Sequence, residues 1–145
     1  MTIADDVREA WGWKGIESVV VLATNKFGNV IFSDQAGSYW RLYPEDLECE
    51  VIADSAAEYE RLLGDPEFIE DWEMARLVQM AESKYGVQPA HRCFCLKMPS
   101  VLGGAYEIEN IGSIGIGELI RLSGDIARQI KDLPPGSKIQ LKVTD

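Results

Sequence analysis

The chain has 145 residues, 46% of them hydrophobic, which suffices for one core that buries roughly two-thirds of the unfolded surface. Fourteen basic and 24 acidic residues give a net charge of −10, a sign that repels phosphate backbones and disfavours nucleic acid as a partner. No apolar run approaches the ~20 residues of a membrane helix, and the N-terminus carries Asp5, Asp6 and Glu9 where a secretory signal would be basic and then apolar. We expect one domain over 1–145, located in the cytoplasm and without a membrane partner.

The first third of the sequence predicts one helix followed by four strands. An amphipathic pattern indicates a short helix at 3–11, and a β-branched run indicates a buried strand at 18–23. Turn residues then lead to three more strands, at 30–32, 38–43 and 47–51, the last two with alternating apolar and polar residues. Because the connections are short, we expect an antiparallel meander.

The middle of the chain predicts helices. A capping box at 55–58 starts a helix that ends at Gly64. Asp65 as N-cap and Pro66 as first helical residue then start another. The apolar residues of this second helix change sides near Glu73, so it is either buried on two sides or bent there.

The last third returns to strands and one long helix. A strand is expected at 92–96, followed by a glycine-rich stretch at 99–117 that contains a short alternating segment. A helix is predicted at 118–131 and a final alternating strand at 139–143. The fold class expected is α+β, a mainly antiparallel sheet packed against three or four helices.

Negative charge is concentrated in one part of the sequence. Between Glu45 and Glu73 there are 12 acidic residues and one basic residue, Arg61. Such a run is either a solvated face that keeps the protein soluble or a surface that attracts a basic partner, and nucleases are commonly basic around the substrate groove. Both interpretations remain open from the sequence.

The three cysteines, Cys49, Cys93 and Cys95, predict reduced, buried thiols rather than a disulfide framework. His91 shares one face of the predicted strand at 92–96 with two of them. His91 and Cys95 would be ~13 Å apart in an extended strand, too far for one tetrahedral zinc ion. No metal site is therefore expected.

No catalytic or cofactor signature emerges. The glycines at 112–117 lack the dinucleotide-binding spacing and the lysine of a phosphate loop, so we interpret them as turn residues with positive φ. His91 lies on the same strand as the nearby thiols and does not point at them. Glu107 and Glu109 share a side, as on the wet face of any short strand. We expect neither an enzyme nor a cofactor.

An aromatic cluster is the remaining candidate for recognition. The segment 39–43 contains two tyrosines, Trp40 and Arg41, and these residue types dominate interface hot spots. The alternation favours Trp40 as a core residue, with Tyr39 and Tyr43 either covering the core edge or contacting a partner.

Three patterns carry a resemblance to a known family. They are TNKFGNV at 24–30, the YWRLYP strand at 39–44, and PSVLGG at 99–104 followed by ENI at 109–111. Together with the downstream helix, over about 20–131, they resemble the bacterial family classed as the C-terminal domain of type VI secretion immunity proteins. Members of that class include antidotes to a secreted DNase.

The resemblance implies a non-enzymatic protein that neutralises a cognate, nuclease-type toxin of a type VI or polymorphic system. The implied partner is a protein, expected to be basic. We propose these candidate contact residues: Tyr39, Tyr43, Glu45, Asp46, Glu48, Glu50, Leu102, Gly103 and Gly104. The alternative is a small-molecule-binding or regulatory domain that uses the glycine-rich region 102–117. If Gly103 or Gly104 has a positive φ, we expect valine there to destabilise the fold.

Overall fold

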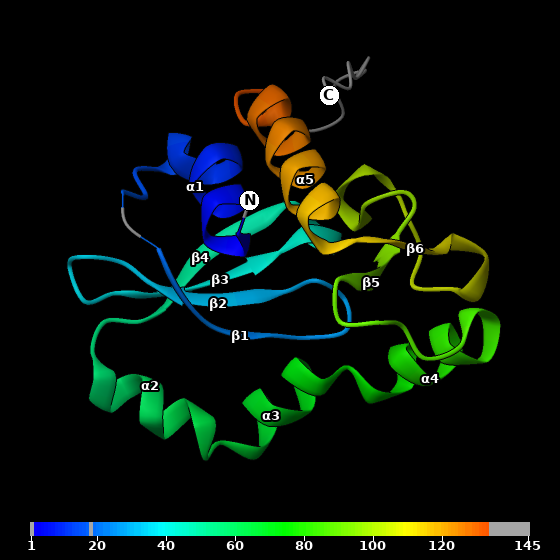
Figure 1. Ribbon diagram of the computed structural model, residues 1–145, viewed down its shortest axis with the longest axis horizontal. Coiled ribbons are helices and arrows are strands. Elements are labelled where there is room, and N and C mark those ends of the chain that lie inside the picture. Colours follow the sequence, from blue (N-terminus) through cyan, green and yellow to red (C-terminus); the bar gives the residue numbers. More distant parts are fainter. Residues whose placement is uncertain (1, 18, 134–145) are drawn as a thin grey trace.

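The computed structural model describes residues 2–17 and 19–133 (Figure 1). Its larger sheet has four antiparallel strands in chain order, so the predicted meander is confirmed. The strands are β1 (Val20–Thr24), β2 (Val30–Ser33), β3 (Tyr39–Tyr43) and β4 (Glu48–Ala53).

The register of β3 and β4 separates a core face from a polar face. Leu42 lies opposite Cys49, and both are buried against the apolar core. Arg41 lies opposite Glu50 on the other face. Since side chains alternate along a strand, this register decides which residues face each helical layer.

The prediction of a buried first strand was wrong. Val20 is 57% exposed and Leu22 43% exposed. β1 is an edge strand whose pairing with β2 shifts between Val21 and Ala23. A β-branched run indicates extended backbone, but it does not reveal whether a neighbour covers the strand.

Two helices cover the core face of the sheet, α1 (Ile3–Trp11) and α5 (Ile116–Ile130). Helix α1 has the predicted bounds, because Thr2 and Asp5 form a capping box at its start. The helices approach so closely that a Cβ on Gly124 would be 2.5 Å from the carbonyl oxygen of Ala10. Arg121 on α5 also donates to the buried Asp6 carboxylate, Nη1 to Oδ1 2.7 Å.

Three helices lie on the opposite side, α2 (Ala56–Leu63), α3 (Pro66–Glu73) and α4 (Ala75–Tyr85) (Figure 1). The predicted caps are confirmed, since the side chains of Ser55 and Asp65 accept backbone N–H bonds at the starts of α2 and α3. The capping box at Ser55 is incomplete, because Glu58 accepts from the backbone N–H of Asp54 instead. No residue of α2 or α3 is fully buried.

Of the two alternatives for the long predicted helix, the structure shows the break near Glu73, which divides it into α3 and α4. Met74 has φ 47° and ψ 41°, a left-handed conformation that ends α3 and precedes α4. We call this junction the elbow. The described part of the chain therefore has five α-helices rather than the three or four expected.

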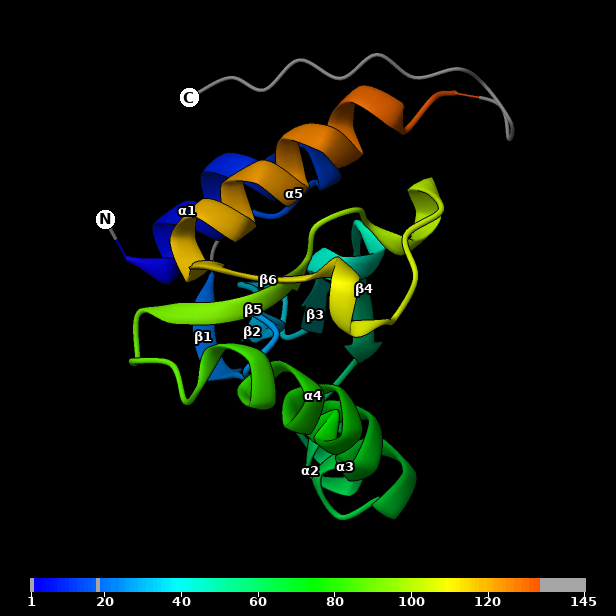
Figure 2. The ribbon, with the colours of Figure 1, turned by 90° about the vertical axis from the view of Figure 1, so that its right-hand side faces the viewer.

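A second, two-stranded sheet pairs β5 (Arg92–Leu96) with β6 (Ile111–Gly115) (Figure 2). It packs against α4 through a smaller apolar cluster that includes Phe27, Val78 and Phe94. The sheet order and these two clusters confirm the α+β class. Among the described residues, no helix has the length and apolar content to cross a membrane.

Two predictions for the glycine-rich region were wrong. The glycines at 112–117 do not form a positive-φ turn but belong to β6 and the first turn of α5. The alternating segment ends in a 3₁₀ turn, Ile108–Asn110, instead of a strand. Local alternation over four residues is too short to fix extended structure without a pairing partner. The predicted strand at 139–143 lies outside the described residues.

Candidate functional site

A groove of about 670 Å³ lies where the end of β3 faces the elbow between α3 and α4. We call it the elbow groove. Its carboxylates are Glu45, Asp46, Glu67, Glu70 and Asp71, and its guanidinium groups are Arg41 and Arg76. Its apolar and aromatic lining is Tyr43, Met74, Ala75, Leu77 and Tyr106.

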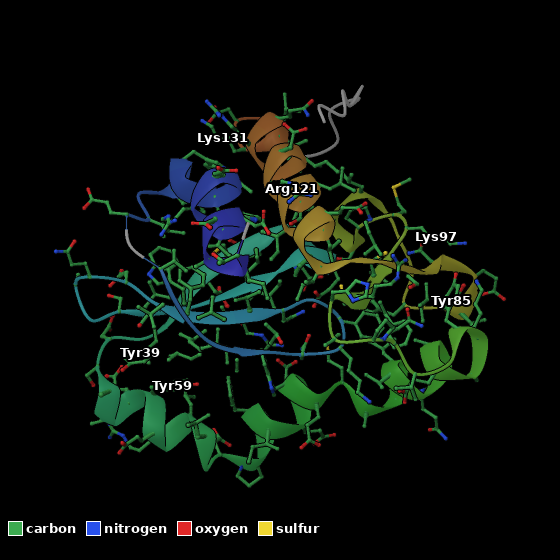
Figure 3. The ribbon with its side chains drawn as sticks, viewed as in Figure 1. Tyr39, Tyr59, Tyr85, Lys97, Arg121 and Lys131 are labelled. Atoms are coloured by element: carbon green, nitrogen blue, oxygen red, sulfur yellow. The ribbon has the colours of Figure 1, made fainter. Side chains whose placement is uncertain are left out.

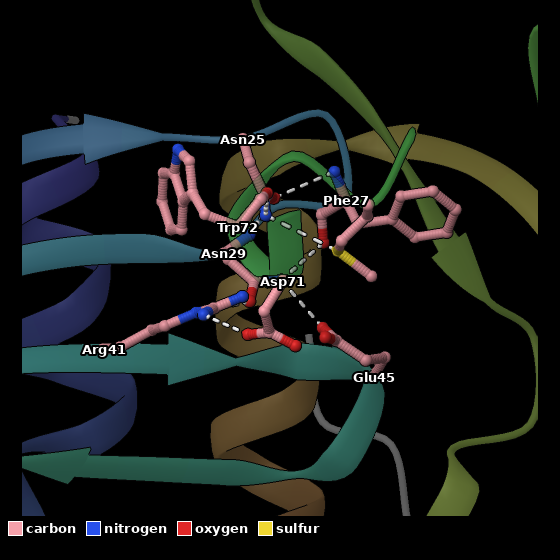
Figure 4. A network of polar contacts seen from close by, with 8 residues as sticks. Asn25, Phe27, Asn29, Arg41, Glu45, Asp71 and Trp72 are labelled. Carbon is pink, nitrogen blue, oxygen red and sulfur yellow. Dashed lines mark hydrogen bonds and ion pairs between the residues drawn. The ribbon is translucent and has the colours of Figure 1, made fainter. Parts of the chain in front are cut away.

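Arg41 is the centre of the network behind this groove (Figure 4). Its side chain is 2% exposed, and Nε donates to Asn29 Oδ1 at 3.0 Å while Nη1 donates to Asp71 Oδ2 at 2.6 Å. The guanidinium carbon also lies 4.3 Å from the ring centroid of Tyr43 and 5.0 Å from that of Trp72. A buried guanidinium requires such partners, so the network fixes α3 against the sheet.

Glu45 lies on the other side of Asn29. Asn29 Nδ2 donates to Glu45 Oε1 at 2.8 Å, and Glu45 is 6% exposed. Burial raises the pKa of the Glu45 carboxyl from 4.5 to about 7, because desolvation disfavours the charged form more than the hydrogen bond from Asn29 favours it. Near neutral pH this carboxyl therefore exchanges between neutral and charged forms.

The elbow is held by the turn between β1 and β2. Asn25 Oδ1 accepts from the backbone N–H groups of Phe27 (3.0 Å) and Asn29 (2.9 Å), and its Nδ2 donates to the carbonyl of Trp72 at 3.0 Å. Met74 and Leu47 are the non-glycine residues of the described chain with positive φ; Met74 lines the groove, and Leu47 follows the lining residue Asp46 in the sequence. Such strained backbone persists only where surrounding contacts enforce it.

A loop from Met98 to Asn110 forms the third wall. The Asn110 side chain accepts from the N–H of Met98 and donates to the carbonyls of Met98 and Ala105, each at 2.9 Å. A Cβ on Gly104 would lie 1.7 Å from the Met98 oxygen. The PSVLGG…EN pattern therefore closes this loop on itself.

The closed loop is attached to the groove through Asp46. Tyr106 donates its hydroxyl to Asp46 Oδ1 at 2.6 Å, and Ser100 donates to the same oxygen. Gly103 has φ 96°, so the condition stated for a destabilising valine is met at this position. Gly104 thus serves close backbone packing and Gly103 a left-handed turn, in the loop that carries Tyr106.

The structure brings some of the predicted contact residues together. Tyr43, Glu45 and Asp46 line the groove, and Glu50 lies beside the Tyr43 hydroxyl. Burial raises the pKa of Tyr43 to about 12, so its hydroxyl stays neutral. These four residues lie at the end of β3, in the connection that follows it and near the start of β4.

The other predicted contact residues lie elsewhere. Tyr39 stacks on Tyr59 of α2 with ring centroids 4.6 Å apart (Figure 3). Glu48 pairs with Lys14 at 2.9 Å, and Leu102 packs against the main core. These three residues have structural partners and lie outside the groove lining.

The candidate contact residues predicted from the sequence did not include Arg41, Asn29 or the groove face of α3. Glu67, Glu70 and Asp71 follow the i, i+3, i+4 spacing that places side chains on one helix face. That spacing was the available signal, within a run already recognised as acidic. The structure adds that this face borders a groove.

The cysteines contribute no chemistry to the groove lining. Burial raises the pKa of the Cys49 and Cys93 thiols to about 12, which keeps them protonated and unreactive. Within residues 2–17 and 19–133, no group of three or more His, Cys, Asp or Glu side chains is arranged to hold a metal ion.

The groove therefore combines carboxylates and aromatic rings with a buried hydrogen-bonded network. The family model described as "T6SS immunity protein Tdi1, C-terminal" matches residues 53–127, more than half of the chain. The chain belongs to this family of type VI secretion immunity proteins, which confirms the resemblance. No curated protein matches the sequence.

Proposed function

We propose that this protein is a non-enzymatic immunity protein that binds a cognate nuclease-type toxin in the cytoplasm through its acidic and aromatic surface. Family membership supports the immunity role. The observation that carries the binding mode is the exposure of the acidic segment: ten of its 12 carboxylates, from Glu48 to Glu73, are exposed. The remaining two, Glu45 and Asp46, line the elbow groove.

An antidote of this kind needs no reacting group. It needs a preformed surface that associates quickly and dissociates slowly. Opposite charges raise association rates above the ~10⁵–10⁶ M⁻¹s⁻¹ of unsteered protein pairs. Because α2 and α3 carry six of the 12 carboxylates and bury none of their residues fully, their outward faces are available to a basic partner.

Coexpression with the protein encoded by the neighbouring gene tests the proposal. We expect a stable complex and rescue of cells from that protein's toxicity. We also expect the association rate to fall about tenfold or more between low and high salt, because salt screens exposed charges. Absence of both complex and rescue would overturn the proposal.

The alternative, a small-molecule site in the region 102–117, has weaker support. It rests on glycines that admit a ligand close to the backbone, but the space beside Gly104 is taken by the Met98 carbonyl. A thermal-shift screen with nucleotides and metabolites tests this alternative. A stabilising ligand whose effect is lost in a loop variant would favour it.

A further inference from the structure

We propose that the elbow groove is the docking site for one basic segment of the toxin, an arginine or lysine side chain flanked by an apolar residue. This inference rests on the proposed function and narrows it from a whole acidic face to one groove. The occupant is identified by charge complementarity and by the apolar floor.

The charge of the groove is incompletely compensated. Five carboxylates face two guanidinium groups, and Arg41 is already paired with Asp71. Neither Glu67 nor Glu70 forms an ion pair with a described residue. A cation entering between α3 and Asp46 would therefore gain attraction without breaking an existing pair.

The floor of the groove favours an organic cation over a bare ion. Met74 and Leu77 present apolar side chains at the elbow, and the rings of Tyr43 and Tyr106 stand at its sides. Arginine and lysine bury their methylene stems against such surfaces while the charged head reaches carboxylates. Arginine also stacks on aromatic rings.

Glu45 supplies a second observation that points to a ligand. Its carboxyl is more than nine-tenths buried at the groove, and Asn29 is its one side-chain hydrogen-bond donor in the described chain. A carboxylate accepts several hydrogen bonds, so Glu45 retains capacity for a donor that arrives from the groove. A guanidinium or ammonium group has the matching chemistry.

The walls are fixed before the partner arrives. Asn25 holds the elbow, Asn110 closes the loop that carries Tyr106, and Arg41 is held from both sides. Little conformational entropy is then lost on binding, which favours affinity.

Paired charge variants test the site. We expect Glu67→Gln with Glu70→Gln to raise the Kd for the neighbouring-gene protein about tenfold or more. Glu9→Gln with Glu60→Gln changes the net charge equally, on α1 and α2, and should change the Kd less than about threefold. Equal effects of the two double variants on the Kd would overturn the proposal that the elbow groove is the docking site. The proposed immunity function would be unaffected.

A steric pair supplies an independent readout. Ala75→Arg places a long cation in the groove, and we expect it to abolish binding without unfolding, since Ala75 is exposed at the start of α4. Ala57→Arg adds the same side chain to an exposed site on α2 and should leave binding unchanged. Normal binding by Ala75→Arg, with both melting temperatures intact, would overturn the proposal.

A peptide probe separates failure of the site from failure of the function. A capped pentapeptide with two arginines around one leucine is titrated into the labelled protein and followed by NMR. Shifts confined to amides at 43–46 and 67–77 would support the elbow groove as a site for a basic segment. If the neighbouring-gene protein nevertheless fails to bind, only the proposed immunity function is overturned. Shifts spread equally over 56–63, or none, would overturn the groove.

A second copy of this chain is the remaining candidate occupant of the elbow groove. Sedimentation of the wild-type chain is expected to show a monomer with and without Ala75→Arg. A wild-type dimer that Ala75→Arg dissociates would assign the groove to a second copy of this chain and overturn the proposal.

Discussion

The two helical layers on the sheet are built by different rules. The layer of α1 and α5 is apolar and close-packed, with glycine at the closest approach and an ion pair from Arg121 to Asp6 at its side. The layer of α2 and α3 has no fully buried residue and is held by ring stacking and the Arg41 network. The layer of α1 and α5 supplies most of the buried apolar contact. The layer of α2 and α3 supplies a charged surface that can remain exposed without loss of stability.

The largest expected effect concerns the packed layer. Gly124→Ala should lower the free energy of unfolding by about 3 kcal/mol, because its Cβ would meet the Ala10 carbonyl at 2.5 Å. Alanine is the better helix former by about 1 kcal/mol, so a net loss isolates the clash. The control is Gly64→Ala, whose Cβ would lie an ordinary 3.7 Å from its nearest neighbour. It should change the free energy of unfolding by less than about 0.5 kcal/mol. Denaturant unfolding measures both variants. Equal free energies of unfolding for the two variants would contradict the close packing of α1 against α5.

The loop beside the groove should respond next. Gly104→Val should cost about 2 kcal/mol, because the Met98 carbonyl must move away. Gly103→Val meets no neighbour but is strained at φ 96°, and should cost about 1 kcal/mol. Thermal unfolding measures both. Unchanged melting temperatures in the two variants would refute the structural role of these glycines.

Glu45, in the connection between β3 and β4, makes the free energy of unfolding depend on pH. The folded carboxyl keeps its proton to about pH 7, whereas the unfolded carboxyl loses it near 4.5, so the folded state binds more protons in between. Its contribution to stability is therefore present at low pH and decreases as pH rises from 4.5 to 7. Water reaches the groove, so we expect about 1–2 kcal/mol of the roughly 3 kcal/mol that the full shift represents.

The isosteric variant Glu45→Gln isolates the contribution of Glu45 to the pH dependence of stability. Glu45→Gln retains an oxygen for Asn29 but cannot ionise, so its stability relative to wild type should increase from pH 4.5 to 7.5. Urea unfolding at four pH values gives the difference. A difference that stays flat with pH would show that Glu45 titrates normally.

The smallest effect concerns the attachment of α2. Tyr59→Leu keeps an apolar side chain but removes the stack on Tyr39, and should lower stability by about 1 kcal/mol. Toxin binding should persist, since neither ring lines the groove. A loss of binding with stability preserved would instead assign these tyrosines to the interface.

Much of the fold was predictable because its signals are local. Capping residues at Thr2, Ser55 and Asp65 fix helix starts within one turn of chain. Short connections between alternating segments fix a meander. The change of apolar side near Glu73 marked the elbow, although the positive φ of Met74 carries no residue-type signal.

The groove was only partly predictable because its signals are distant. Alternation places Arg41 on the polar face, but nothing nearby in the sequence reveals that Asp71 and Trp72 will cover it. Asn25 belongs to the predicted turn between the first two strands, but its hydrogen bond to the Trp72 carbonyl spans 47 residues of sequence. Acidic residues were recognised by composition, and only tertiary contacts select those beside the groove.

The division of the groove between two stretches of chain has a consequence for what the family match defines. Arg41, Glu45 and Asp46 precede the region 53–127 that the family model covers, whereas the elbow and Tyr106 lie inside it. One wall thus comes from the common scaffold and the facing wall from outside it. A chain that shares only the matched region would therefore carry the elbow and Tyr106 but not Arg41, Glu45 and Asp46, so that region alone does not define this groove.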